Sequence, residues 1–386
     1  MGFVSIDKEY VANTYNRFPI EVVSGNGACY TDINGKEYID MGSGIGVTSF
    51  GVNDSQWKSA IVEQINKIQH TSNLYYTEPC ALLAKALCEK TGMKKVFFSN
   101  SGAEANECAI KVARKYAAEN KGEEYYNIIT LENSFHGRTL TTLAATGQEH
   151  YHELFKPLTD GFIHTPANDL DALKAAVEQN KVAAVMLECV QGEGGVIALD
   201  KDYIEGVYKL SLEKDFLIII DEVQTGNGRT GKLYAYMNFD IKPDIVTTAK
   251  GLGGGLPIGA ALLSEKVQNV LGFGDHGSTY GGNPVCCAAA LSVINRLTDD
   301  FLQSVSEKSR YVFEQFSSAE GVESISGMGL MIGIKPKKSA TEVVTVAREK
   351  GVLCLTAKDK VRLLPPLNIS FEDLKQAIDV IKEALV

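Results

Sequence analysis

Short apolar runs alternate with longer amphipathic stretches through the middle of the chain, and this alternation constrains the fold more than any other feature. The runs are almost continuously apolar, as expected for strands that are covered on both faces. The stretches between them have helical spacing, as at residues 103–119 and 170–179. The pattern predicts a mostly parallel α/β sheet with helices on both sides. The candidate strands are residues 95–99, 126–131, 183–188, 217–220, 245–248 and 260–263.

The two ends of the chain have a different pattern. Residues 25–39 are typical of a β-hairpin that turns at Asn34-Gly35. Beyond about residue 290, helical stretches alternate with short strands up to a final amphipathic helix. We therefore expect both ends to build one smaller α+β domain. The expected division is an N-terminal segment at 1–45 that joins this domain, a large α/β domain at 46–288 and a C-terminal part at 289–386.

The composition is that of an ordinary globular protein. A chain of 386 residues is long for one core and suggests two packed domains. The net charge of −10 argues against nucleic acid and anionic membrane surfaces as main partners. No apolar stretch is long enough to cross a bilayer, and residues 1–10 lack the pattern of a secretory signal. We therefore expect a cytoplasmic protein.

The cysteines and histidines show no spacing typical of a metal site or a disulfide framework. None of the eight cysteines forms a C-x-x-C pair, and several lie in apolar runs. Reduced, buried thiols are expected. Among the six histidines only His150 and His152 are closely spaced, which is a weak signal for a metal. No metal site is predicted.

A lysine and an acid each follow one of the candidate strands. Lys250 ends an apolar run and precedes the glycine-rich segment 251–255, which leaves room for a bulky planar partner. A single such lysine is more often a solvated loop residue. Asp221, however, follows the run at 217–220, and ligands of parallel sheets bind at the carboxyl ends of strands. Pyridoxal phosphate needs a lysine that forms an imine and an acid that keeps its pyridine nitrogen protonated. The pair predicts a pyridoxal phosphate site.

The segment from Ser99 to Asn106 joins a candidate strand to a helix. Ser101 is a credible N-cap, and Glu104 completes a capping box. A well-capped helix is a sufficient structural explanation. The free N–H groups of Gly102 and Ala103, with the helix dipole behind them, would also bind a phosphate. The two interpretations are compatible.

Further candidates follow two other strands. Phe135 is suited to stack on a planar cofactor, and Arg138 to clamp a carboxylate through two hydrogen bonds. Taken singly, such a phenylalanine is more often core and such an arginine more often part of a surface ion pair. His136 is interpreted as structural. Glu188 and Glu193 lie in a glycine-rich turn and need a cationic partner, for which Arg362 is the distant candidate.

Five motifs of this chain resemble, in order and spacing, those of the class III (ornithine-type) aminotransferases. They are residues 100–106, 135–140, 221–226, 249–251 and 277–284. The resemblance runs essentially end to end and is strongest to the acetylornithine branch, mainly through residues 135–148 and the compact length. It implies fold type I of the pyridoxal-phosphate-dependent transferases. That fold has a large domain with a mostly parallel seven-stranded sheet and a smaller α+β domain from both chain ends.

The resemblance also implies a role for each matching residue. Lys250 would carry the cofactor and move the substrate proton, and Asp221 would pair with the pyridine nitrogen. Thr279 would reach the phosphate from the partner subunit of a homodimer, with Ser278 near the substrate. The other implied cofactor contacts are Gly102 and Ala103 at the phosphate, Phe135 on one ring face, Gln224 near the phenolic oxygen, and Glu222 and Val223.

The implied reaction transfers the terminal amino group of N-acetylornithine to 2-oxoglutarate, a step of arginine biosynthesis. Arg138, helped by Tyr15, would hold the α-carboxylate of acetylornithine while Glu193 neutralises Arg362. Glu193 would then swing away, and Arg362 would take the α-carboxylate of glutamate. This exchange avoids an unpaired buried charge in either half-reaction.

Two departures from the family pattern and several alternatives remain. Residues 51–55 replace a stretch that is often histidine-rich, which predicts altered loop packing. Ile45 stands where ornithine aminotransferases commonly have a tyrosine, and an apolar residue suits an acylated nitrogen better than an ammonium. The sequence leaves open the acyl group and the oligomer beyond a dimer. The alternatives are aminotransferases for succinylornithine, ornithine or 4-aminobutyrate, a same-fold aminomutase or decarboxylase, and a cofactor-free binding protein.

Overall fold

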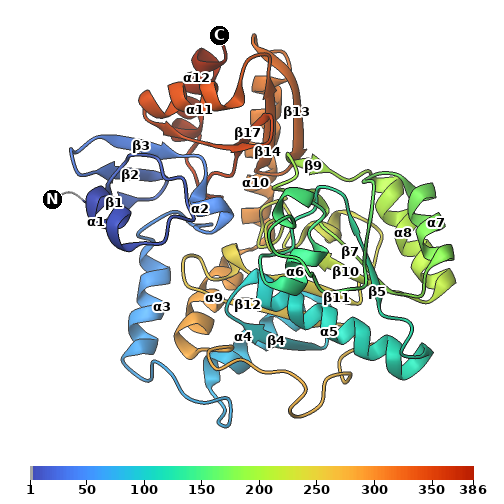
Figure 1. Ribbon diagram of the computed structural model, residues 1–386. Helices are drawn as coiled ribbons and strands as arrows, with labels where there is room; N and C mark the ends of the chain where they lie inside the picture. Colours follow the sequence, from blue (N-terminus) through green and yellow to red (C-terminus); the bar gives the residue numbers. More distant parts are fainter. Residues whose placement is uncertain (1–2) are drawn as a thin grey trace.

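A seven-stranded mixed sheet forms the centre of the large part of the molecule (Figure 1). The computed structural model describes residues 3–386, so Met1 and Gly2, the start of the expected N-terminal segment, lie outside the described residues. In spatial order the strands are β4 (Lys95–Ser99), β12 (Gly259–Leu263), β11 (Ile245–Thr248), β10 (Leu217–Asp221), β7 (Val182–Leu187), β5 (Asn127–Leu131) and β6 (Phe162–Thr165). Only β12 runs antiparallel to its neighbours within this described sheet, so the predicted mostly parallel sheet is confirmed.

Helices cover both faces of the sheet, which explains why its strands are almost continuously apolar. Leu217 and Ile219 of β10 pack in a cluster with helix α5 (Gly102–Lys121). Ile218 and Ile220 point the other way and belong to the main core. That core also contains residues of the remaining covering helices, α4 (Glu78–Thr91), α7 (Leu170–Gln179), α8 (Lys201–Lys214) and α9 (Pro284–Arg296).

The two ends of the chain meet in a second region, where the blue N-terminal strands lie beside the orange and red C-terminal elements (Figure 1). The predicted hairpin is present, with Cys29 opposite Ile39. One sheet has the order β1 (Val22–Asn26), β2 (Cys29–Asp32), β3 (Glu37–Asp40) and β15 (Val352–Leu353). A second has the order β13 (Val322–Met328), β14 (Met331–Pro336), β17 (Lys360–Leu363) and β16 (Leu355–Ala357). The helices α10 (Asp299–Phe316), α11 (Ala340–Glu349) and α12 (Phe371–Leu385) accompany them.

Strand β3 pairs with β15 in parallel, through Val352 and Ile39. This pairing joins an N-terminal strand to a C-terminal one in the second region. The domain boundaries at 45/46 and 288/289 remain predictions. Among residues 3–386, no helix is long and apolar enough to span a membrane. All eight cysteines are free thiols.

Candidate active site

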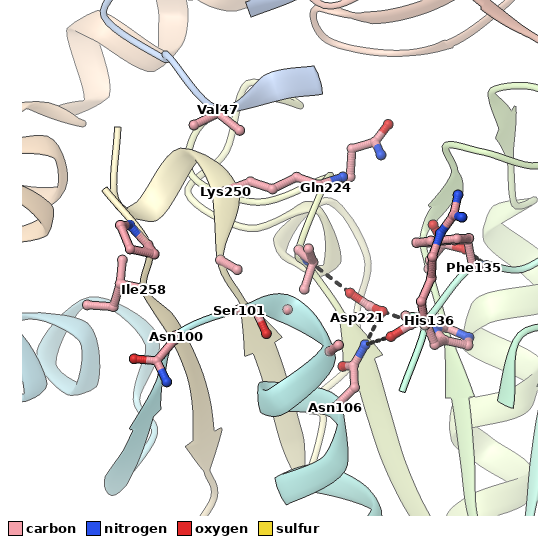
Figure 2. Close-up of a pocket in the computed structure, with 18 of the residues that line it drawn as sticks. Val47, Asn100, Ser101, Asn106, Phe135, His136, Asp221, Gln224, Lys250 and Ile258 are labelled. Carbon is pink, nitrogen blue, oxygen red and sulfur yellow. Dashed lines mark hydrogen bonds and ion pairs between the residues drawn. The ribbon is translucent and has the colours of Figure 1, made fainter. Parts of the chain in front are cut away.

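A cavity of ≈ 530 Å³ lies at the carboxyl edge of the large sheet (Figure 2). Its size is in the range of small-molecule and cofactor sites. Residues from the ends of β10 and β11, from the start of α5 and from the loop after β5 all line it, so four separate segments converge there. The polar and aromatic lining residues include Asn100, Ser101, Asn106, Phe135, His136, Arg138, Glu188, Asp221, Gln224 and Lys250.

Asp221 is the last residue of β10 and is buried beneath the cavity. Its Oδ1 atom accepts a hydrogen bond from the N–H of Val223 at 3.0 Å. Its Oδ2 atom accepts one from Nδ2 of Asn106 at 2.8 Å and lies 2.8 Å from Nδ1 of His136 (Figure 2). These three contacts fix the carboxylate in one orientation. A carboxylate that pairs with a cationic ring nitrogen needs such a fixed orientation.

Two of these contacts were missed from the sequence. His136 was interpreted as structural, and Asn106 was given no role, although both belong to motifs noted above. The structure places the His136 ring and the Asn106 amide directly against Asp221, and Asn106 also donates to the carbonyl of His136 at 2.7 Å. The signal available in the sequence was that each residue belongs to one of those motifs.

Lys250 begins a short 3-10 helix, η3 (Lys250–Leu252), immediately after β11. Its φ is +47°, a left-handed conformation that costs free energy in a residue with a side chain and is found mostly at functional sites. Asn227 secures the preceding turn, since its Nδ2 atom donates to Oγ1 of Thr248 at 3.0 Å and to the carbonyl of Ala249 at 3.1 Å. The neighbouring structure thus holds Lys250 in a strained position on the cavity wall.

Burial lowers the pKa of the Lys250 amine. The nearby charge of Arg362 lowers this pKa further, whereas Glu193 and other carboxylates around the cavity oppose the shift. A lysine with a lowered pKa is deprotonated more often at neutral pH, and only the neutral amine is a nucleophile. The electrostatics of the site therefore suit covalent chemistry at this nitrogen.

The start of α5 forms the opposite wall of the cavity. Oγ of Ser101 accepts the N–H of Glu104 at 3.2 Å, which confirms the predicted N-cap. The wall needs glycine at position 102, because a Cβ there would lie 2.6 Å from Cγ1 of Val223. With Gly102 and Ala103 in the cavity lining, the first N–H groups of a twenty-residue helix are available to an anion.

Phe135 and Arg138 line the side of the cavity that follows β5. The Phe135 ring makes an edge contact with Tyr151, and the Arg138 guanidinium lies 5.8 Å and 4.9 Å from these two ring centroids. Arg138 is exposed and, within residues 3–386, makes no ion pair. Its guanidinium is free to bind the carboxylate of a ligand.

Arg362 and Glu193 form an ion pair beside the cavity. Nη1 of Arg362 lies 2.5 Å from Oε1 of Glu193, and the arginine side chain is almost completely buried. Gln224 links both to the cavity: its Nε2 donates to Glu193 at 3.2 Å, and its Oε1 accepts from Arg362 at 3.3 Å. Burial opposes ionisation of Glu193, but the charge and hydrogen bond of Arg362 outweigh it and lower the pKa of this carboxyl. The structure thus brings together the arginine and the acid of the predicted exchange.

Some predicted site residues lie away from this cavity. Tyr15 is exposed, packs against Arg17 and lines a separate hollow formed by residues 3–22. Ser278 and Thr279 line another cavity of the same chain, and Oγ of Ser278 accepts from Nδ2 of Asn100 at 3.1 Å. Asn100 itself lines the first cavity but not this second one. Within residues 3–386, neither Tyr15 nor Thr279 lines the first cavity.

Glu222 and Ile45 also differ from expectation. Glu222 is fully buried and does not line the cavity. Its carboxylate accepts hydrogen bonds from the hydroxyl of Thr225 at 2.5 Å and from the N–H of Tyr236 at 2.8 Å. It anchors the loop after β10. Ile45 lies in a run of four residues with left-handed backbone, which forms α2 (Ser43–Gly46). Ile45 does not line the described cavity, whereas Val47, two residues on, does. The apolar residue that the structure places at the cavity is therefore Val47.

These residues fit pyridoxal phosphate. The N–H groups at the start of α5 suit its phosphate, and the fixed carboxylate of Asp221 suits a protonated pyridine nitrogen. Phe135 and Val223 line the space where the ring would lie, and the amine of Lys250 faces the same space. Two further features agree with this cofactor. Gly102 leaves room for Val223 beside the start of α5, and the pKa of Lys250 is lowered.

Comparison with known proteins places the chain in a family. Residues 10–385 match the model of the family described as aminotransferase class-III. The chain is a class-III aminotransferase. Enzymes of this family use pyridoxal phosphate, so the predicted fold, enzyme class and cofactor are confirmed.

This class-III aminotransferase has full-length relatives. It is 52% identical to the acetylornithine aminotransferase of Haemophilus ducreyi, over 98% of this chain and 97% of the relative. Among solved structures, it resembles the ornithine aminotransferase of Toxoplasma gondii with a TM-score of 0.94 and 31% identity, over 99% and 94% of the two chains. It resembles N-acetylornithine aminotransferase of Stenotrophomonas maltophilia with a TM-score of 0.86 and 34% identity, over 99% and 98%.

Proposed function

We propose that this aminotransferase transfers the terminal amino group of N-acetylornithine to 2-oxoglutarate, giving N-acetylglutamate semialdehyde and glutamate. The observation that carries the proposal is the ion pair of Arg362 with Glu193 beside the cavity, while Arg138 has no ion-pair partner within residues 3–386. One arginine is thus ready for a carboxylate and a second is masked. The name of the relative that is 52% identical supports the same substrate.

The two arginines give each substrate one orientation. With Arg362 masked by Glu193, the α-carboxylate of acetylornithine binds Arg138, and its terminal amine points towards Lys250. With Glu193 displaced, Arg362 takes the α-carboxylate of glutamate or 2-oxoglutarate, and Arg138 takes the γ-carboxylate. Pyridoxal phosphate, when bound, supplies an electron-withdrawing ring that holds the transferred amino group. Lys250 moves the proton, and Asp221 keeps the ring nitrogen charged.

An amine-donor panel tests the substrate. With 2-oxoglutarate fixed, kcat/KM is compared for N-acetylornithine, N-succinylornithine, ornithine and 4-aminobutyrate. We expect N-acetylornithine to be preferred to ornithine, because the apolar residue Val47 lines the cavity and suits an acylated nitrogen better than an ammonium. A preference for free ornithine or 4-aminobutyrate would overturn the proposal. An aminomutase or a decarboxylase would be recognised by its product from a single amino acid.

We further propose that the active enzyme is a homodimer in the cytoplasm, with Thr279 of the partner subunit at the cofactor phosphate. Thr279 is exposed, and exposed aromatic side chains lie near it in the sequence at Phe273 and Tyr280. A mixing experiment tests this arrangement. Refolding Lys250→Ala together with Thr279→Ala would create hybrid dimers with one intact site, so activity should reappear. No recovery in verified hybrids would show that each chain builds its own site.

A further inference from the structure

Glu188 is a buried carboxyl that joins two segments of the active site. It follows β7, is 5% exposed and lines the cavity. Its Oε2 atom accepts the N–H of Phe135 at 3.0 Å, and its Oε1 atom accepts the N–H of Gly192 at 3.4 Å. One side chain therefore ties the segment that carries Phe135 to Gly192, the residue immediately before Glu193.

The backbone on both sides of Glu193 has little room to move. A Cβ on Gly192 would lie 2.3 Å from Oε1 of Gln224, and a Cβ on Gly194 would lie 2.5 Å from the carbonyl oxygen of Asn133. The loop thus packs closely against Gln224 on one side and the segment before Phe135 on the other. Displacement of Glu193 from Arg362 must then occur mainly by rotation of its side chain, from a backbone position that the surrounding contacts define.

We propose that Glu188 is a positioning residue that favours the closed Glu193–Arg362 pair and so sets the discrimination between terminal and α-amino donors. This inference rests on the proposed function, because only an exchange between two carboxylate-binding states gives such a pair a role. Glu188 orients the Gly192 peptide, the peptide orients Glu193, and Glu193 masks Arg362. Weakening the first contact should unmask the arginine while Arg138 and Arg362, the two groups that bind the substrate carboxylates, stay unchanged.

Two variants of Glu188 separate position from charge. In Glu188→Gln, the amide oxygen can still accept one N–H, and we expect the shorter hydrogen bond, that from Phe135, to persist. The NH₂ group then faces the N–H of Gly192, and because both groups are donors the second hydrogen bond is lost. In Glu188→Asp a carboxyl group remains, but the shorter side chain cannot reach both N–H groups. Both variants should loosen the loop at Gly192.

Equilibrium binding of glutarate to the holoenzyme, measured by calorimetry, reports how far Arg362 is unmasked. Glutarate has the two carboxylates of 2-oxoglutarate but no reacting group, so its affinity does not depend on turnover. We expect Glu188→Gln and Glu188→Asp to bind it roughly threefold to tenfold more tightly than the wild type, the effect of one buried hydrogen bond. On a Glu193→Ala background, Glu188→Gln should produce no further change, because its effect passes through Glu193.

Asp244→Asn is the matched control, since Asp244 also accepts a backbone N–H, that of Ile218 in β10, but at the opposite edge of the sheet. It should leave glutarate affinity unchanged even if it lowers the melting temperature. Unchanged glutarate affinity in both Glu188 variants, or an equal gain on the Glu193→Ala background, would overturn the inference. A gain in Glu188→Gln but not in Glu188→Asp would assign the effect to charge and would also overturn it. If the wild type ignored N-acetylornithine, the proposed function would fail while this binding cycle could still be completed.

Discussion

Oδ2 of Asp221 lies 2.8 Å from Nδ1 of His136, and both side chains are buried. The same oxygen accepts from Asn106, and the second oxygen accepts from the N–H of Val223. A carboxylate held by contacts from three segments cannot rotate to follow a ligand, so the ligand must meet it in a fixed place. That rigidity is what preorganised electrostatic stabilisation requires.

Asp221→Asn should abolish most of the activity while the protein stays folded. The amide keeps the shape of the side chain but loses the charge that holds a proton on the pyridine nitrogen. We expect a loss of roughly 3 kcal/mol or more in transition-state stabilisation, on the order of a hundredfold or more in kcat. Single-turnover kinetics measure the loss, and circular dichroism checks the fold. A variant with nearly normal kcat would show that another acid serves the ring nitrogen.

His136→Phe should have a smaller effect than Asp221→Asn. The variant keeps a ring in the same space but removes the contact with Oδ2, whereas the donors Asn106 and Val223 remain. Loss of one such hydrogen bond predicts a decrease of about threefold to tenfold in kcat. The absorbance of the bound cofactor as a function of pH should shift as well, which a purely structural histidine would not cause. An unshifted absorbance profile would return His136 to a structural role.

Lys250→Ala should bind pyridoxal phosphate but not turn over. The start of α5 and Asp221 remain to hold the cofactor, while the only amine that lines the described cavity is removed. In the wild type, borohydride reduction should attach the cofactor to Lys250, as located by peptide mass spectrometry. Exposed Lys232, a little earlier in the sequence, is a suitable control position for substitution. A reduced adduct on any other lysine would contradict the assignment.

Arg362→Ala should impair the half-reaction with 2-oxoglutarate far more than the half-reaction with N-acetylornithine. In the half-reaction with N-acetylornithine, Glu193 neutralises Arg362, so this arginine contributes little to substrate binding. Glu193→Ala should instead impair the selectivity of the half-reaction with N-acetylornithine. Because Arg362 is then unmasked, α-amino acids should compete with N-acetylornithine for the site. Single-turnover absorbance follows each half-reaction separately. Equal slowing of both halves by Arg362→Ala would make Arg362 a structural ion-pair partner.

The stability of the protein should decrease as the pH rises through the range in which Glu222 ionises. Burial raises the pKa of this carboxyl to about 7, whereas the unfolded chain has its ordinary value of 4.5. Between these values the folded state binds more protons than the unfolded state, so the contribution of Glu222 to the free energy of unfolding falls as pH rises. Glu222→Gln cannot ionise. Its melting temperature relative to the wild type should therefore increase between about pH 5 and about pH 8.

The exposed residue Glu123 provides the control for this measurement. Glu123→Gln should follow the wild type across the same pH range, because its side chain lies in solvent in both states. If the difference in melting temperature between Glu222→Gln and the wild type stayed constant with pH, the raised pKa of Glu222 would be contradicted.

The sequence predicted the sheet well because its strands are buried on both faces and are therefore almost continuously apolar. It missed β6, an edge strand whose residues Phe162 to His164 are only partly buried, so the apolar pattern is weaker there. Lys250 and Asp221 could be proposed from the sequence because each directly follows an apolar run. The family resemblance supplied the pairing of Arg362 with Glu193, two residues far apart in the chain.

The contacts that no local pattern indicates were not predicted. His136 and Asn106 reach Asp221 only because the loop after β5 and the start of α5 meet β10 in three dimensions. The left-handed backbone around Ile45, which places Val47 in the cavity lining, has no sequence signature beyond its glycines. The position expected for Thr279 depends on a neighbouring subunit, and the roles expected for Tyr15 and Thr279 remain predictions.

The parallel pairing of β3 with β15 has a consequence for biosynthesis. Strand β3 is made early in translation, but its partner Val352 emerges only when almost the whole chain has been synthesised. The large sheet, whose strands all lie between these two, has its residues available first. Pairings between residues so distant in sequence form slowly, because a long loop must be closed before the contact is gained. The pairing of the N-terminal hairpin with β15 should thus wait for the C-terminus, and the region around Arg362 should be the last part of the site to assemble.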